Sequence, residues 1–321
     1  MNDNDMFPQG PDPDNTEFKY TPVDEPVIHP VLAAFLGLVG VFFLYQIIGS
    51  LVTLLVLGFD IENADINSLR LMTVAGQLIF ILVPTLILSL LVYKDIPSTL
   101  RLKLPSVKET TIFIIGLIIL TPLLQELLYI QNYLFDLLAQ ASPVFDKLKS
   151  LLDELDKAIE STYGSLLGAD NMLEYMLVII VVAVVPAICE EAFFRGYVQK
   201  SFEKKLKPFW AILITSLLFG MYHFNPSALI ALTILGMYLG YAAYKSNSLL
   251  VPVILHFINN FVAVIAFFVF GNEDLTNLEV VEKMGLTDHL VALVLFSSIF
   301  ILFLYLTHKN YQKLTTEGEM S

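Results

Sequence analysis

The sequence predicts an all-α, polytopic membrane protein, a helical bundle with about eight transmembrane helices. Of its 321 residues, 56% are hydrophobic and only 15% are charged, and the mean hydropathy is +0.71. Soluble domains average about 45–50% apolar and about 25% charged residues. The apolar residues also gather into separate segments, and many of these approach the ~20 residues that a helix needs to cross a bilayer.

Eight apolar segments follow one another along the chain. They cover residues 31–57, 71–93, 111–131, 173–198, 209–224, 228–244, 249–271 and 289–307. The fifth and sixth are short, and Asn225-Pro226 between them indicates a tight turn. These two either cross the membrane separately or form one hairpin that does not cross it. The sequence has no internal repeat of the kind that many transporters show.

The distribution of basic residues predicts that both ends of the chain face the cytoplasm. With this orientation, 12 Lys and Arg residues lie in inner segments and five in outer ones, as the positive-inside rule requires. We therefore expect a multi-pass integral protein of the cell (inner) membrane. Residues 1–30 are acidic and proline-rich, unlike a signal peptide, and are typical of a disordered cytoplasmic tail.

Charge and cysteine content argue against several classes of function. The formal net charge of -13 argues against nucleic acid as a partner, because phosphate binding needs a basic face. The single cysteine, Cys189, allows no intrachain disulfide and no metal site built from several cysteines. It also lies directly before Glu190, and the negative charge of Glu190 disfavours the thiolate that nucleophilic catalysis needs.

The longest loop, residues 132–172, is predicted to lie on the outer side of the membrane and to contain an amphipathic helix. Apolar residues recur there at helical spacing, and acidic residues fill the other face. The apolar positions are Val144, Leu148, Leu151, Leu152, Leu155 and Ile159. Such a helix serves either as a packing element of the bundle or as a lid over an active site.

Ionisable residues lie inside the fourth span, where each costs at least ~2.5–3.5 kcal/mol. Glu191 and Arg195 are four residues apart and share a helix face, so we expect them to pair. Glu190 points about 100° away from Glu191 and is expected to face a cavity. Pro186, just before them, is expected to kink the helix. A buried Glu–Arg clasp alone does not explain the second carboxylate.

Two further polar pairs lie in later spans. Phe219 and His223 share one helix face, and His256 and Asn260 share another. An imidazole and a carboxamide that point the same way can donate hydrogen bonds to a developing oxyanion. The structural alternatives are a hydrogen-bonded core histidine and a polar clamp between helices.

Other hydrolase signatures are not found in the sequence. It contains no H-E-x-x-H zinc motif, no G-x-S-x-G nucleophile elbow and no pair of intramembrane aspartates. The remaining pattern is E-E-x-x-x-R, F-x-x-x-H and H-x-x-x-N, in that order on successive late spans. It resembles the CPBP family of intramembrane proteases, which includes the type II CAAX prenyl endopeptidases and Abi-like proteins.

The resemblance implies an intramembrane endopeptidase that acts on a lipidated or membrane-anchored peptide or protein. Glu190 and His223 would then activate a water, and His256 and Asn260 would stabilise the oxyanion. Glu191, Arg195 and Phe219 would support the site. Family members are commonly classed as metalloproteases, so Glu190, His223 and His256 are also candidate zinc ligands. A metal-free glutamate mechanism fits the same residues equally well.

Two alternative functions remain open at this stage. One is a catalytically silent membrane scaffold or immunity-type protein on the same fold, and the other is a proton-coupled transporter that uses Glu190 and His223 as a relay. The expected organisation has five parts. They are the tail at 1–30, N-terminal spans at 31–131, the outer loop at 132–172, CPBP-like catalytic helices at 173–271, and the last span with a cytoplasmic tail at 272–321.

Overall fold

All regular elements of the described chain are helices, which confirms the predicted all-α class. The computed structural model describes residues 25–60, 64–271 and 284–315. Most of the predicted disordered tail at 1–30 and the end of the C-terminal tail lie outside the described residues. Each of the eight apolar segments forms a helix.

Six helices within the described ranges are long and apolar enough to cross a membrane. Three of them are interrupted by π-helical turns. Their bounds are α1 Pro30–Phe42, η1 Phe43–Gly49 and α2 Ser50–Leu57; α3 Ile66–Gln77, η3 Leu78–Leu82 and α4 Val83–Tyr93; α6 Val107–Ala141; α8 Met172–Ile179, η4 Ile180–Val184, α9 Val185–Glu191, η5 Ala192–Val198 and α10 Gln199–Glu203; α13 Leu250–Phe270; and α15 Leu286–Thr315.

The two short predicted spans are observed as α11, Pro208–Tyr222, and α12, Leu229–Ser246. With 15 residues, α11 is about 22 Å long at 1.5 Å per residue, less than the ~30 Å hydrocarbon core. Residues 223–228 connect α11 to α12, and the two helices pack against each other. They form a tight helical hairpin that carries His223 at its turn.

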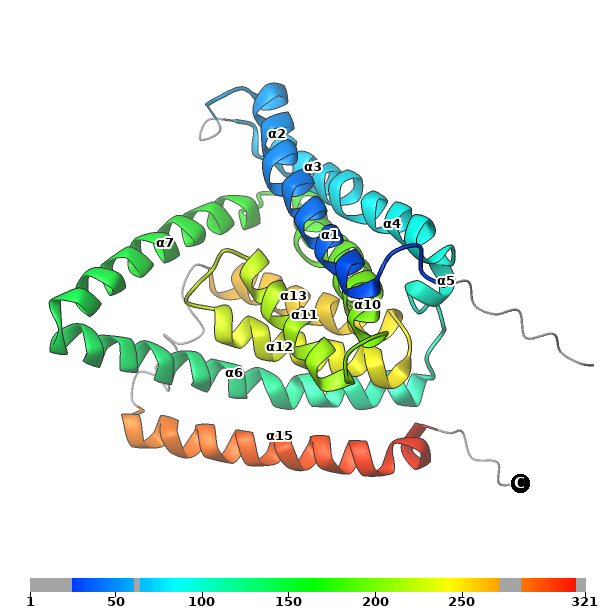
Figure 1. The fold of residues 1–321 in the computed structure, drawn as a ribbon. Helices are drawn as coiled ribbons and strands as arrows, with labels where there is room; N and C mark the ends of the chain where they lie inside the picture. Colours follow the sequence, from blue (N-terminus) through cyan, green and yellow to red (C-terminus); the bar gives the residue numbers. More distant parts are fainter. Residues whose placement is uncertain (1–24, 61–63, 272–283, 316–321) are drawn as a thin grey trace, which may run out of the picture.

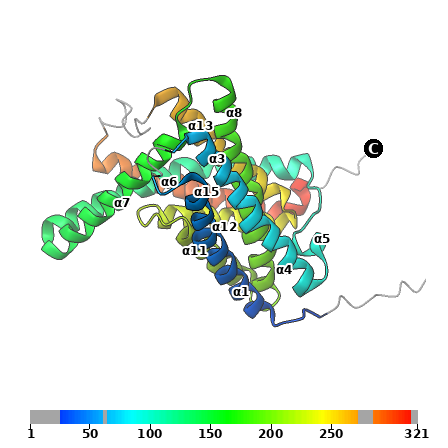
Figure 2. The ribbon, with the colours of Figure 1, turned by 90° about the horizontal axis from the view of Figure 1, so that it is seen from above.

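A long helix, α6, packs along α15 and continues into a hairpin with α7, Pro143–Leu167 (Figure 1). The predicted amphipathic helix is therefore present, although α6 extends ten residues beyond its expected end at 131. From the end of α6, α7 runs back at an angle toward α3 (Figures 1 and 2). There the buried Arg70 side chain donates from Nε to the Leu166 carbonyl at 3.0 Å, which ties the end of α7 to α3.

Two of the π-helical turns end two residues before a proline. Segment η3 precedes Pro84 and η4 precedes Pro186. A proline lacks the N–H donor and crowds the carbonyl one turn earlier, so the preceding turn widens. The kink expected at Pro186 therefore takes the form of a π-helical turn. This turn ends six residues before Glu190 and so helps to set the direction of that side chain.

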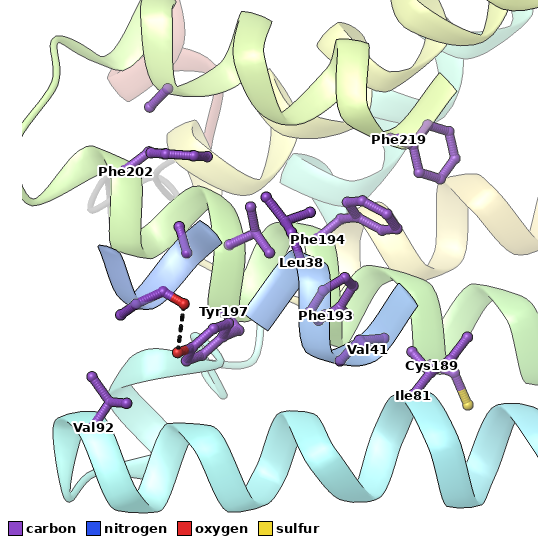
Figure 3. Close-up of a cluster of buried hydrophobic side chains, with 14 of the residues drawn as sticks. Leu38, Val41, Ile81, Val92, Cys189, Phe193, Phe194, Tyr197, Phe202 and Phe219 are labelled. Atoms are coloured by element: carbon purple, nitrogen blue, oxygen red, sulfur yellow. Dashed lines mark hydrogen bonds between the residues drawn. The ribbon is translucent and has the colours of Figure 1, made fainter. Parts of the chain in front are cut away.

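One core cluster joins α1 and α3–α4 to the helix that carries the two glutamates (Figure 3). It includes Cys189, which is fully buried among apolar side chains such as Ile81 and Phe193. The Tyr197 hydroxyl donates to the Ala33 carbonyl at 3.1 Å, shown as the dashed line in Figure 3. Because lipid tails are as apolar as these side chains, close packing and hydrogen bonds hold the helices together.

Small residues let α12 approach the helix α9–η5–α10. Gly236 and Gly240 are four residues apart, the spacing of a G-x-x-x-G contact. Their carbonyls accept hydrogen bonds from Arg195 at 3.2 Å and from Gln199 at 2.9 Å. Side-chain donors on the helix α9–η5–α10 thus bond directly to the backbone of α12, which fixes the position of both helices.

Candidate active site

The three sequence motifs come together as a single cluster in the structure. Glu190 and Glu191 end α9, Arg195 lies in η5, His223 caps the end of α11, and His256 and Asn260 lie on α13. These elements meet because α13 packs on α9 and η4 while α11 packs on η5. Residues up to 70 positions apart therefore share one site.

Glu191 is the centre of a fully buried ionic cluster. Its Oε1 atom accepts from Arg195 Nη1 at 2.8 Å and from His256 Nδ1, also at 2.8 Å. The side chains of Glu191 and Arg195 have no exposed surface, and that of His256 is 5% exposed. The ion pair that the i, i+4 spacing predicts is therefore confirmed, and it extends to a histidine on another helix.

This cluster also fixes the orientation of His256. Because a carboxylate oxygen can only accept, the Nδ1 atom of His256 carries the proton in that hydrogen bond. Carboxylate–histidine pairs of this kind orient the ring and set its tautomer. The Nε2 atom is left for other partners. When the His256 ring is neutral, Nε2 can only accept a hydrogen bond. It can donate one only when the ring is an imidazolium.

Glu190 lies in a different environment from its neighbour. Its side chain is 18% exposed, and its Oε2 atom lies 3.9 Å from Nε2 of His223. Within the described residues, this Oε2 atom is buried and has no hydrogen-bond partner. A buried carboxylate oxygen without a partner is rare and calls for an explanation. As the spacing predicts, Glu190 is separate from the Glu191–Arg195 pair and is the more exposed of the two carboxylates.

His223 faces Glu190 with its ring fixed from behind. Its Nδ1 atom lies 2.8 Å from the Phe219 carbonyl, so Nδ1 carries the proton and Nε2 is an acceptor when the ring is neutral. The side chain is 27% exposed. Glu190 Oε2 and His223 Nε2 thus present two acceptor atoms side by side, close enough for one water to donate to both.

Phe219 occupies the space between these groups. Its ring is buried and lies edge-on to both imidazoles. The ring centroids are 4.6 Å apart for His223 and 6.0 Å apart for His256. The Arg195 guanidinium lies over its face, 4.3 Å from the ring centroid, in a cation–π contact. Phe219 therefore holds two imidazoles and an arginine in place through its ring and its carbonyl.

Asn260 has partners that its position on the helix did not indicate. Its Nδ2 atom donates to the Val182 carbonyl in η4 at 2.9 Å, and its Oδ1 atom accepts from Asn259 Nδ2 at 3.1 Å. Asn260 therefore bonds to Val182 and Asn259, whereas His256 bonds to Glu191. The bond to Val182 couples α13 to the π-helical turn before Pro186. The second amide hydrogen of Asn260 takes no part in these two bonds.

The resemblance implies a metal ion, which three of the site residues would have to hold. Glu190, His223 and His256 offer a carboxylate and two imidazole nitrogens, the right chemistry for zinc. Among the described residues, however, no three His, Cys, Asp or Glu side chains converge closely enough to hold a metal ion. In this arrangement the residues present do not fit a metal ion.

Two tyrosines near Glu190 were not predicted from the sequence. Tyr45 of η1 and Tyr163 of α7 both lie within electrostatic range of its carboxylate. Partial burial and then the charge of Glu190 raise the pKa of the Tyr163 phenol. A tyrosine within an apolar span is the only sequence signal for Tyr45. Tyr163 could not be found from sequence, because its approach depends on the angle between α6 and α7.

Helix α7 also contacts the turn that carries His223. Ser227 donates from Oγ to Asp156 of α7 at 2.8 Å, and its carbonyl accepts from Gln131 of α6 at 2.6 Å. Several apolar residues of α7 remain about half exposed, among them Leu151 and Leu155. The α6–α7 hairpin therefore forms one wall beside the site, the position that the lid interpretation requires.

Comparison with known proteins agrees with the motifs. Residues 172–262 match the family model described as type II CAAX prenyl endopeptidase Rce1-like. No curated protein and no solved structure matches the chain. All seven motif residues, from Glu190 to Asn260, lie inside the matched segment. The resemblance that the three motifs predict is therefore confirmed for residues 172–262, which are similar to the Rce1-like type II CAAX prenyl endopeptidases.

Proposed function

We propose that this protein is an intramembrane endopeptidase that hydrolyses a peptide bond with a water activated by Glu190 and His223. The family match supports CAAX-type protease activity within the membrane. The single observation that carries the finer proposal is the pair of adjacent acceptors, Glu190 Oε2 and His223 Nε2, 3.9 Å apart. Two acceptors can hold and polarise one water, and the carboxylate can take its proton.

The reaction follows ordinary general acid–base chemistry. Glu190 removes a proton from the water as its oxygen attacks the substrate carbonyl carbon. The carbonyl becomes a tetrahedral oxyanion, and the protonated Glu190 then gives the proton to the leaving amine as the C–N bond breaks. One carboxylate thus serves as base and then as acid, and no net proton is lost from the site.

Two groups are placed to stabilise the oxyanion. His256 can donate from Nε2 when it is an imidazolium, while its Nδ1 atom stays bonded to the Glu191 carboxylate. Asn260 can donate its second amide hydrogen while the first remains bonded to Val182. Each fixed donor of this kind contributes about 10²–10³ in rate in well-studied hydrolases.

The substrate is proposed to be a lipidated or membrane-anchored peptide or protein. The support is twofold: the family match, and the position of the site within helices that are apolar enough to span a bilayer. A substrate that reaches the site must therefore partition into the membrane, which a lipid anchor achieves.

The test is cleavage of a fluorogenic peptide, with and without a prenyl group, by the protein in proteoliposomes. We expect cleavage of the prenylated peptide, confirmed by product mass. We expect His223→Ala to slow it by about 10²–10⁴-fold. His29→Ala, a change of an exposed histidine at the start of α1, is the matched control and should leave the rate unchanged. Wild-type rates in His223→Ala would contradict the proposal.

A chelator in the same assay separates the two forms of the mechanism. Cleavage that continues in a strong chelator supports the metal-free glutamate mechanism. Cleavage that stops, and returns when zinc is added, assigns Glu190, His223 and His256 as zinc ligands in a rearranged site.

A further inference from the structure

A cavity lies where the segment after α5 (Ile96–Thr99) meets α10, α12 and α15. Its volume is about 690 Å³, and Arg101, just after α5, lines it together with residues in or next to those three helices. The C-terminal end of α15 and α5 lie on the same side of the molecule (Figures 1 and 2). No residue of the candidate active site lines this cavity, so the two sites are separate.

Positive charge is concentrated in this cavity, although the chain as a whole carries -13. Five basic side chains line it, against the single carboxylate of Glu203. They are Arg101, Lys200, Lys245, Lys309 and Lys313. One carboxylate cannot neutralise five cations, so the cavity attracts an anion.

Arg101 is held in the wall of the cavity in an unusual way. Its side chain is 1% exposed and pairs with Glu203 at 2.5 Å, yet its buried Nε atom has no partner among the described residues. Its backbone adopts a left-handed conformation with φ of 54°, which is strained for a non-glycine residue. The Arg101 carbonyl accepts from Leu249 at 3.0 Å, which helps to hold this conformation. Backbone strain of this kind clusters at functional sites.

An apolar groove adjoins the basic cavity. It has a volume of about 580 Å³, lies between α11, α12 and α15, and shares His308 with the basic cavity. Apart from the imidazole of His308, only aliphatic and aromatic side chains line it, among them Phe209, Ile234 and Leu304. Each volume is within the range of about 300–1,000 Å³ that is typical of ligand sites.

We propose that these joined cavities bind an anionic phospholipid, with its phosphate in the basic cavity and an acyl chain in the apolar groove. An amphiphile matches both halves, whereas free phosphate would leave the groove unused. Basic pockets between membrane helices at the inner surface recognise anionic head groups in this way. Binding would join α5, α10 and α12 to the end of α15, which otherwise packs mainly on α6.

The test measures lipid binding to the full chain in detergent. The two readouts are native mass spectrometry and the shift of the unfolding midpoint. We expect phosphatidylglycerol to bind and to raise the midpoint, and phosphatidylcholine to do so at least 10-fold more weakly. The double change Lys309→Ala and Lys313→Ala should weaken phosphatidylglycerol binding by about 10–30-fold. Both lysines are exposed, so this variant is expected to fold.

The matched control is the double change Lys205→Ala and Lys207→Ala. These lysines are also exposed but do not line the cavity, and their loss should leave binding unchanged. Leu304→Lys places a charge in the groove and should weaken the phospholipid without affecting inorganic phosphate. Equal binding of both lipids, equal loss in both double variants, or inorganic phosphate that binds as tightly as phosphatidylglycerol would overturn the proposal.

Discussion

Two neighbouring glutamates on one helix have opposite environments. Glu191 is fully buried and accepts hydrogen bonds from Arg195 and His256. Glu190 is partly exposed and faces His223. A helix turns by about 100° per residue, so adjacent residues belong to different faces. The first carboxylate therefore serves chemistry in our account, and the second serves structure.

Arg195 makes the structural part of this division testable. It donates to Glu191 and to the Gly236 carbonyl and lies over the Phe219 ring. Arg195→Ala leaves the Glu191 charge buried without its main partner, so we expect a loss of about 3–5 kcal/mol in unfolding free energy. Arg195→Lys keeps the charge but not the planar fork, and should lose less.

The measurement is the unfolding midpoint in detergent for the wild type and both variants. The expected unfolding midpoint is highest for the wild type, lower for Arg195→Lys and lowest for Arg195→Ala. An Ala variant that unfolds at the wild-type midpoint would show that the cluster does not stabilise the fold.

Part of the site could be predicted from the sequence, because helical spacing places residues four apart on one face. The Glu191–Arg195 pair and the separate direction of Glu190 follow from this rule alone. The bond from His256 to Glu191 joins residues 65 positions apart, and the bond from Asn260 reaches a π-helical turn. Spacing within one helix contains no information on either contact, since both depend on how helices pack.

At the scale of the elements, small residues set how closely the helices approach. Gly116 of α6 faces α12 and α15, and a Cβ atom there would overlap the Tyr238 hydroxyl and lie 2.5 Å from Phe303 Cε1. The Tyr238 hydroxyl also donates to the Phe113 carbonyl at 2.7 Å. The glycine therefore allows a tyrosine on α12 to bond to the backbone of α6.

We expect Gly116→Ala to destabilise the protein by about 1–3 kcal/mol, the usual cost of overpacking a core. Gly40→Ala is the matched control, because nothing lies within 4 Å of a Cβ atom there. In a helix interior this control should be neutral or stabilise by up to about 1 kcal/mol. Thermal unfolding of both variants in the same detergent decides the matter. Equal midpoints would contradict the close packing of α6, α12 and α15.

The elements themselves were largely predictable, because long apolar segments indicate helices whatever their packing. All eight segments are helices, with boundaries that differ by up to about ten residues, as at the end of α6. The π-helical turns were not predicted, since a proline indicates a distortion but not its form. The angle of α7 was not predicted either. It follows from tertiary contacts such as Ser227 to Asp156.

At the scale of the whole molecule, the basic residues predict how the protein lies in the membrane. With both ends inside, the loop that contains α7 faces outward and the α10–α11 turn faces the cytoplasm. The native Cys189 is fully buried, so it should give little background in thiol labelling. An introduced surface cysteine can therefore report which side it lies on.

We expect a membrane-impermeant maleimide to label Lys147→Cys on intact cells and to leave Lys207→Cys unlabelled until the membrane is opened. Both positions are exposed, so access rather than burial decides the result. The reverse pattern would invert the orientation. It would also place the basic cavity at the outer surface.

The central claim is that Glu190, and not the adjacent Glu191, activates the water. The most direct measurement compares Glu190→Gln with Glu191→Gln, using cleavage of the prenylated peptide and the unfolding midpoint of each. We predict that Glu190→Gln loses at least about 10²-fold in cleavage rate and keeps the wild-type midpoint, whereas Glu191→Gln lowers the midpoint. A Glu190→Gln variant that cleaves at the wild-type rate would contradict the account.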